Sequence, residues 1–266
     1  MSQLIDRKQK EKEFFDAFRG ELATDPRYHP NDHYYELLAP RNRDFVKQWL
    51  ADRCTGKRVL DYCCGNGSEA IWIAQAGAYV HGFDISPVSV QNASAEAIRQ
   101  RVDHQAVFSV MDAEALAFPD DCFDLINVAG VLHHLGLEAA YREMARVLKP
   151  GGEAICVEAL RHNPIIHLYR KLTPHLRTAW EVDHILGKKE IQLAKKYFRT
   201  VEVARFFHFL SLGSVPFRKL SIFPWLLKTS EAIDSFLFKL PIVKWQAWMA
   251  VFVLADPKKP RRNTQE

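Results

Sequence analysis

Several features that would point to particular classes of protein are missing from this sequence. Its five cysteines, at positions 54, 63, 64, 122 and 156, form no C-x-x-C pair and have no metal-ligand spacing. We therefore expect a reduced, cytoplasmic chain without disulfides. The first residues contain no long apolar stretch, so we expect no secretory signal. The longest strongly apolar segment, residues 245–255, is too short to span a bilayer, which argues against an integral membrane protein.

The net charge of the whole chain is small, +4, but the charged residues are unevenly distributed. Residues 1–150 carry 17 Lys and Arg against 22 Asp and Glu, whereas residues 151–266 carry 19 against 10. A basic second half suits an acidic substrate, an anionic membrane surface or nucleic acid. A solvated surface with scattered lysines explains it equally well. No catalytic carboxylate pair, metal cluster or nucleophile triad stands out, so we predict no metal site.

The clearest pattern present is a strand, a glycine turn and a helix over residues 58–74. Val59, Leu60 and Tyr62 belong to a short apolar run that is typical of a buried parallel strand. Gly65-Asn66-Gly67 follows, and a helix-period segment comes next. Glycine lets a ligand approach the backbone closely, and the start of a helix presents unpaired N–H groups. The pattern therefore predicts a nucleotide site in an α/β fold.

The turn differs from the dinucleotide fingerprint G-x-G-x-x-G. Asp61 precedes it, and Ala70 replaces the third glycine. A carboxylate there would repel phosphate and favour a cationic or amine-bearing ligand. Asp61-x-Cys63-x-Gly65-x-Gly67 resembles the first motif, D-x-G-x-G-x-G, of the class I S-adenosylmethionine (SAM)-dependent methyltransferases, with Cys63 where that family often has glycine.

Later segments strengthen the resemblance because they follow in the order of that family. They are strand-like 79–84 ending in Asp84, a helix opened by Ser86-Pro87, strand-like 104–111 with the loop 112–119, strand-like 123–128 running into 129–135, and 148–152 before strand-like 153–160. The resemblance implies a Rossmann-like α/β fold, with a seven-stranded, mostly parallel sheet, helices on both faces and an antiparallel last strand.

The resemblance also implies roles for single residues toward SAM, whose product would be S-adenosylhomocysteine. Asp84 would accept hydrogen bonds from the ribose hydroxyls, and Asp112 would accept one from the adenine amine. The complete set of expected cofactor-binding residues is Asp61, Cys63, Gly65, Asn66, Gly67, Asp84, Ile85, Asp112, Ala113, Asn127, Val128 and Ala129. An imidazole can take a proton near neutral pH, and of the adjacent histidines we expect His133 to face the substrate. We assign catalytic roles to His133 and Tyr34, and substrate contacts to Tyr35 and His134.

The rest of the chain is expected to surround this core. Residues 1–54 form a helical cap, with helices over about 1–24 and 42–52 separated by a turn- and aromatic-rich stretch at 28–35. Residues 55–160 form the SAM-binding core. Residues 161–256 complete the sheet, with strands at 200–209 and 247–256 and insertions at about 161–186 and 211–244. Residues 257–266 form a basic tail that we expect to be solvated.

The insertion at 211–244 is long for a connection between two strands and rich in aromatic and basic residues. Three interpretations stay open: a lid over an apolar substrate pocket, a surface that docks on a membrane, or an ordinary extension of the core.

For the whole chain we predict methyl transfer to an oxygen or nitrogen of a small organic metabolite, acidic or hydrophobic in character. A lipid or quinone methyltransferase at the membrane surface is the first alternative, and a non-catalytic SAM-binding regulator is another. A tRNA methyltransferase is disfavoured because no RNA-binding module and no N-P-P-[YF] motif is present. A nicotinamide oxidoreductase fits least well, given Asp61 and Ala70.

Overall fold

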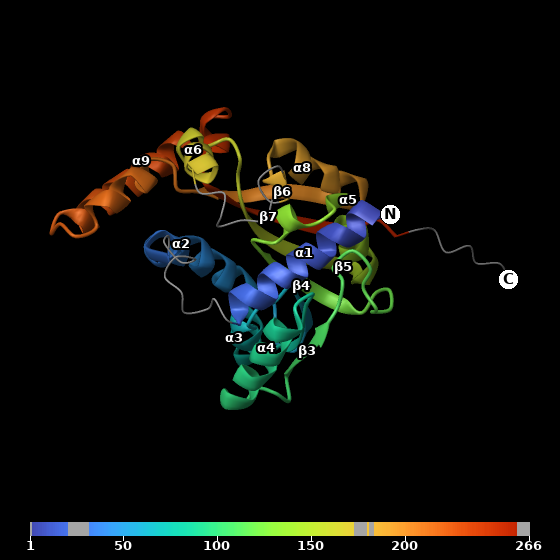
Figure 1. Ribbon diagram of the computed structural model, residues 1–266. Coiled ribbons are helices and arrows are strands. Elements are labelled where there is room, and N and C mark those ends of the chain that lie inside the picture. Colours follow the sequence, from blue (N-terminus) through green and yellow to red (C-terminus); the bar gives the residue numbers. More distant parts are fainter. Residues whose placement is uncertain (1, 21–31, 173–179, 181–183, 260–266) are drawn as a thin grey trace.

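The computed structural model describes residues 2–20, 32–172, 180 and 184–259, and its centre is a seven-stranded sheet (Figure 1). The strands are β1 Arg58–Tyr62, β2 Tyr79–Asp84, β3 Ala106–Val110, β4 Phe123–Ala129, β5 Leu148–Ala159, β6 Phe198–Phe207 and β7 Met249–Pro257. Their order across the sheet is β3-β2-β1-β4-β5-β7-β6. β1 to β5 are parallel, and β7 is antiparallel to both of its neighbours. The predicted fold class is confirmed.

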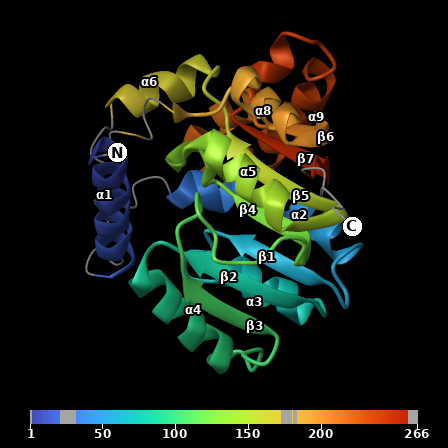
Figure 2. The same ribbon diagram turned by 90° about the vertical axis from the view of Figure 1, so that its right-hand side faces the viewer.

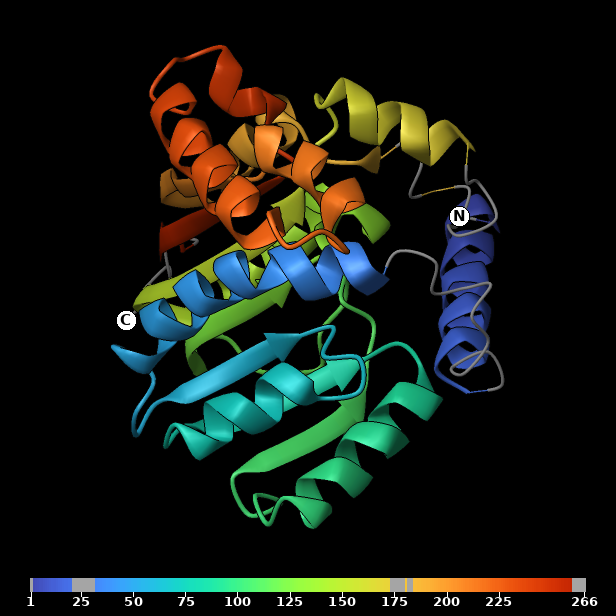
Figure 3. The same ribbon diagram turned by 90° about the vertical axis from the view of Figure 1, so that its left-hand side faces the viewer.

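Helices cover both faces of this sheet (Figures 2 and 3). They are α1 Ser2–Arg19, α2 Asp32–Ala51, α3 Ser68–Gln75, α4 Pro87–Arg99, α5 Leu137–Val147, α6 Pro164–Leu172, α8 Lys188–Leu193 and α9 Phe223–Leu237, with short 3-10 helices η2 Leu132–His134, η4 Ala194–Lys196, η5 Leu210–Phe217 and η6 Val243–Gln246. One core cluster joins the sheet to α5 and α8. The second joins it to α2, α3 and α4. The sheet is thus a buried layer between two helical layers.

The helix after β2 begins as its sequence indicates. Ser86 is the N-cap of α4, and its hydroxyl oxygen accepts a hydrogen bond from the Ser89 N–H at 3.0 Å. Pro87 occupies the first turn, where a missing N–H costs nothing. This local signal places the start of α4 directly beneath the end of β2.

The helix before β1 starts earlier than predicted. Residues 32–35, expected to lie in a turn, belong to α2, and Pro40 lies inside that helix. A proline ends many helices because it lacks an N–H and crowds the preceding turn. Here tertiary packing prevails, since Leu38, Val46 and Leu50 are buried against the sheet at helical spacing.

One further prediction is corrected at the C-terminal end. Lys259, expected in a solvated tail, donates to the carbonyl oxygens of Ala145 (2.7 Å) and Arg146 (3.0 Å) at the end of α5. A cation at that place complements the helix dipole. Residues 260–266 lie outside the described part. Among the helices that the structure describes, none combines the length and the apolar character needed to cross a bilayer.

Candidate active site

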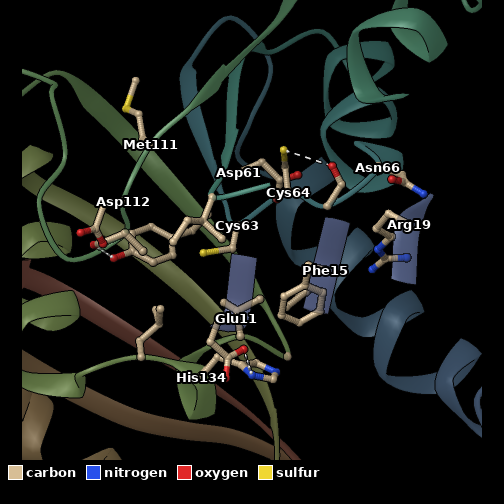
Figure 4. A pocket seen from close by; sticks show the side chains of 18 of the residues that line it. Glu11, Phe15, Arg19, Asp61, Cys63, Cys64, Asn66, Met111, Asp112 and His134 are labelled. Carbon is tan, nitrogen blue, oxygen red and sulfur yellow. Dashed lines mark hydrogen bonds and ion pairs between the residues drawn. The ribbon is translucent and has the colours of Figure 1, made fainter. Parts of the chain in front are cut away.

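A cavity of about 650 Å³ opens at the carboxyl edge of the parallel strands, which is a volume typical of small-molecule sites. Its floor is the turn after β1, and its sides are the ends of β2 and β4 and the loop after β3. Helix α1 covers it from the opposite side (Figure 4). Residues 210–246 are all described and none of them lines the cavity. The insertion thus does not cover this cavity, which α1 covers instead, and the lid interpretation stays a prediction.

The turn after β1 takes backbone conformations that favour glycine. Gly65 and Gly67 have φ angles of 50° and 78°. A Cβ on Gly67 would lie 2.7 Å from the Cβ of Ala93. Helix α4 can therefore pack closely against this turn only because residue 67 has no side chain. Cys63 also has a positive φ, 56°, which gives a physical reason why glycine is frequent at this motif position.

Asp84, at the end of β2, is held by the backbone. Its Oδ2 accepts from the Gly65 N–H and its Oδ1 from the Ser86 N–H, both at 3.0 Å. Burial raises the pKa of this carboxyl, while the two amides and the nearby Arg19 lower it. The carboxylate is thereby fixed beside the glycine turn, next to Ile85, which lines the cavity, but Asp84 is not itself among the lining residues.

Asp61 is a buried carboxylate, one oxygen of which no described residue satisfies. Its side chain is buried, with 3% of the residue exposed, and its Oδ1 accepts from the Asn127 amide at 2.8 Å. Among the described residues, Oδ2 has no hydrogen-bond partner. Burial raises the pKa of Asp61 to about 7, with the Asn127 amide opposing this and the charge of Glu69 adding to it. A buried carboxylate oxygen without a donor is costly unless a ligand supplies one.

The loop after β3 forms another side of the cavity. The cavity is lined here by Met111, Asp112 and Ala113, and by Ile85 from the end of β2. Asp112 accepts the Glu114 N–H at 2.9 Å and forms an ion pair with Lys8 of α1 at 2.6 Å. The carboxylate that the resemblance assigns to adenine is thus bonded to the helix that covers the cavity.

The end of β4 contributes less than expected. Of the three residues predicted there, only Ala129 lines the cavity. Val128 is fully buried in the core, and Asn127 lies behind Asp61, to which it donates. Alternation along the strand explains Val128, which points to the other face. Asn127 shares the face of Ala129 but lies further from the strand end, bonded to Asp61.

Of the two histidines, only His134 lines the cavity, whereas His133, predicted to face the substrate, does not. The ring of His133 is buried, and its Nδ1 lies 2.7 Å from Oε2 of Glu158 on β5. Oε1 of Glu158 accepts the N–H groups of Val131 (2.8 Å) and Leu132 (2.7 Å). His134 instead lines the cavity, with its Nδ1 3.1 Å from Glu11 of α1. Glu158, which sequence reasoning missed, therefore decides which imidazole faces the cavity.

Helix α1 belongs to the N-terminal cap that the sequence analysis expects, but the side chains with which it lines the cavity were not predicted. Its lining residues are Arg7, Lys8, Glu11, Phe15, Phe18 and Arg19. Figure 4 shows Glu11, Phe15 and Arg19 facing His134 and the turn that carries Cys64 and Asn66. The helical spacing of Phe15 and Phe18 was visible in the sequence, but not their target. Tyr34 and Tyr35 fall in α2, and their side chains lie outside the described part.

Comparisons with known proteins agree with this geometry. A family model described as "Methyltransferase domain" matches residues 59–152. The chain is 41% identical over 99 residues to 27-O-demethylrifamycin SV methyltransferase of Amycolatopsis mediterranei, covering 36% of each chain. It is 39% identical over 106 residues to ubiquinone/menaquinone biosynthesis C-methyltransferase UbiE of Nitrobacter hamburgensis, covering 38% of this chain and 41% of that one. This chain carries a class I SAM-dependent methyltransferase domain.

Solved structures show the same fold. The YcgJ protein from Bacillus subtilis superposes with a TM-score of 0.57 at 23% identity, covering 82% of this chain and 99% of that one. Phosphoethanolamine N-methyltransferase 2 of Haemonchus contortus gives a TM-score of 0.58 at 19% identity, covering 82% and 53%. The chain spans between about a third and three fifths of the length of the curated relatives that it matches.

The methyltransferase domain accounts for only part of the cavity. Residues 59–152 contain the glycine turn, Asp61, Asp84, Asp112 and His134. Helix α1 and residues 210–246 lie outside that match. The wall formed by α1 is therefore not part of the matched domain.

Proposed function

We propose that this chain transfers a methyl group from SAM to an oxygen or nitrogen of a small organic acceptor by in-line displacement. The observation that carries the proposal is the buried Oδ2 of Asp61, which has no donor among the described residues and lies beside a turn shaped by Gly65 and Gly67. An ammonium group is the donor that suits a buried carboxylate best. The methionine part of SAM carries one.

Asp84 and several lining residues suit the rest of this cofactor. Asp84, already held by two backbone amides, would accept the ribose hydroxyls without having to reorganise. Ile85 and Met111 offer apolar contacts for adenine, and Asp112 with the Ala113 N–H offers polar ones. Cys63 and Ala129 line the space beside Asp61. Burial raises the pKa of the Cys63 and Cys64 thiols, so both are protonated at neutral pH and are poor nucleophiles.

The acceptor would bind between the sheet edge and α1. SAM supplies an electrophilic methyl group on a sulfonium, so the chain's main task is to hold the acceptor atom in line. His134 faces the cavity and is oriented by Glu11, and Phe15 lies edge-on to its ring with centroids 5.3 Å apart. In the proposal His134 takes over the proton-accepting role that we first assigned to His133. Helix α1 excludes water from the same space.

That the acceptor atom is oxygen or nitrogen is our proposal and does not follow from the comparisons, because similar proteins include C-methyltransferases. A non-catalytic SAM-binding regulator is the competing reading. It would keep Asp61 and Asp84 functional but would have no use for a proton acceptor at position 134.

Calorimetric titration with SAM tests the cofactor assignment. We expect micromolar binding by the wild type and a loss of at least about 100-fold in Asp84→Ala, since each hydrogen bond to a charged group contributes about 1.5–3 kcal/mol. Asp103→Ala, at an exposed site after α4, is the matched control and should bind normally. A folded wild type that binds no SAM would falsify the proposal.

Transfer of a labelled methyl group to a panel of oxygen, nitrogen and carbon acceptors tests the chemistry. His134→Gln should bind SAM as the wild type does but transfer the label more slowly, by about 100-fold or more if the base is needed. Equal rates in the two proteins would remove His134 from the mechanism. SAM binding without transfer to any acceptor would favour the regulatory reading.

A further inference from the structure

The inner face of α9 carries two acids beside apolar side chains such as Leu227, which packs against the core. Asp234 is buried, with 3% exposed, and accepts the N–H groups of Phe209 (2.9 Å), Leu210 (2.7 Å) and Ser211 (3.2 Å). Glu231, one turn earlier, forms an ion pair with Arg41 of α2. A surface helix normally turns its apolar side inward and its charges outward. In α9 both acidic residues are used to attach the helix to the body.

The opposite face of the same helix is apolar and exposed. Trp225 and Phe236 are 64% and 66% exposed, and Ile233 lies on the same side of the helix at 45%. Ile222 and Leu240, just beyond the two ends, and Ile242 at 82% extend this face. We refer to these six residues as the outer α9 surface. In Figures 1 and 3 α9 lies outside α2, away from the sheet, so this surface is at the periphery of the molecule.

The charges that flank this surface have one sign. Residues 210–246 contain five basic residues, at 218, 219, 228, 239 and 244, and only the two acids that are engaged inward. Arg218, Lys219, Lys228 and Lys239 are exposed. Lys239 stands 5.9 Å above the ring of Phe236, so its charge lies directly over the apolar face. Exposed aromatic residues ringed by lysine are typical of helices that lie in the headgroup region of a bilayer.

We propose that the outer α9 surface binds the chain to anionic phospholipid bilayers as a peripheral membrane protein. Charge favours this partner over a second copy of the chain. A twofold symmetric contact would bring the same basic residues face to face without acids between them. An anionic bilayer instead accepts both the lysines and the apolar side chains.

The topology relates this surface to the cavity. β6 runs parallel to β1, so the connection from β6 to β7 leaves the sheet at the carboxyl edge, where the cavity lies. Both ends of this connection thus lie at the cavity edge of the sheet, although none of residues 210–246 lines the cavity itself. Docking itself requires neither SAM nor methyl transfer, so it stands or falls separately from the proposed function.

Flotation of the full chain with vesicles tests the proposal in the absence of SAM. One set of vesicles is phosphatidylcholine, and the other is phosphatidylcholine mixed with phosphatidylglycerol. We expect binding to the anionic vesicles only, weakening as salt is added. Lys219→Glu, Lys228→Glu and Lys239→Glu combined should lower the partition coefficient by at least about 100-fold, because each basic residue near such a surface contributes on the order of 1 kcal/mol.

Apolar contacts are tested by Trp225→Ser combined with Phe236→Ser, which should weaken binding at least about tenfold while the melting temperature stays unchanged, since both side chains are exposed. The matched controls are Ile98→Ser on α4, an equally exposed apolar residue, and Lys57→Glu before β1. Equal losses in controls and α9 variants, or no vesicle binding by the wild type, would overturn the proposal. A dimer in light scattering that the serine variants dissociate would also overturn it, in favour of a second copy.

Discussion

The two walls of the cavity are attached to the molecule in different ways. The sheet wall is fixed by its own backbone, since the Gly65 and Ser86 amides hold Asp84 and the Val131 and Leu132 amides hold Glu158. The wall formed by α1 is held by side chains. Arg7 pairs with Glu114, Lys8 with Asp112, and Asp16 accepts the Ser86 hydroxyl at 2.5 Å.

The sheet wall is therefore preorganised by the folded backbone, whereas the α1 wall depends on side-chain contacts that can break individually. Backbone hydrogen bonds at strand ends persist for as long as the sheet is folded. Ion pairs between partly exposed side chains are weak and are screened by salt. The Lys8–Asp112 pair is partly exposed, whereas Arg7 and Glu114 are buried, so we expect the Lys8 contact to open more readily while the backbone bonds of the sheet wall persist. The following variants break or sharpen the comparison, starting with the largest expected effect.

Gly67→Ala should damage the sheet wall most. The new Cβ would lie 2.7 Å from Ala93 Cβ at a φ of 78°, so a steric clash adds to backbone strain. We expect the free energy of unfolding to fall by about 3 kcal/mol, measured by urea denaturation, and SAM binding to weaken. Gly151→Ala is the matched control because Gly151 has a similar φ of 74° but open space around it. An equal cost at both positions would show that strain alone matters.

Asp61→Asn tests the unpartnered carboxylate through its pH dependence. Because burial raises the pKa of Asp61 to about 7, the folded protein holds this proton more tightly than the unfolded one. Stability from this group is therefore lost as the pH rises from about 4 to about 7. Thermal melts should show Asp61→Asn to be more stable than the wild type above about pH 7, with little difference near pH 4.

The same variant should bind SAM less well. Losing a charge-assisted hydrogen bond costs about 2 kcal/mol, or roughly 30-fold in affinity. Wild-type binding should tighten as the pH rises through about 7, because the ammonium needs the ionised Asp61. Calorimetry over that pH range should find no such tightening in Asp61→Asn, and a parallel trend in both proteins would remove Asp61 from the ammonium site.

The sheet wall was predictable because its signals are local. Asp61, Gly65 and Gly67 lie within seven positions of one another. Ser86 and Pro87 mark the start of α4. The α1 wall was not predictable in the same way. Lys8 and Asp112 are 104 positions apart, and nothing in either neighbourhood identifies the other.

The orientation of side chains at the cavity also depended on distant residues. His133 turns inward because Glu158 of β5 meets it there, and an acid in an apolar strand was the only available signal. The rotation of α9 about its axis is fixed by Arg41 and by the backbone of residues 209–211. Composition identified the aromatic and basic character of that segment but not the face on which it would appear.

Lys8→Ala should loosen the α1 wall alone. Its ammonium is partly exposed and joins α1 to Asp112 at 2.6 Å and to Glu114 at 3.1 Å. Loss of such a pair costs about 1 kcal/mol, which corresponds to roughly fivefold faster exchange of α1 amides. Hydrogen exchange in β1 and β4 should not change. Gln9→Ala, whose partner Glu13 is on the same helix, is the control. Faster exchange in β1 as well would mean that the walls are coupled.

Cys63→Gly should have the smallest effect, and its sign is informative. Cys63 holds a φ of 56°, a conformation that costs a residue with a Cβ about 1 kcal/mol and glycine little. Against this, glycine loses more freedom on folding, by up to about 1 kcal/mol, and leaves the space of the thiol empty beside the core. We expect the free energy of unfolding to change by less than about 1 kcal/mol in urea denaturation. Calorimetry should find SAM affinity retained, because Asp61 and Asp84 are untouched. A large loss of SAM affinity would instead show that the Cys63 side chain contacts the cofactor, so that this departure from the motif is part of the sheet wall's binding surface.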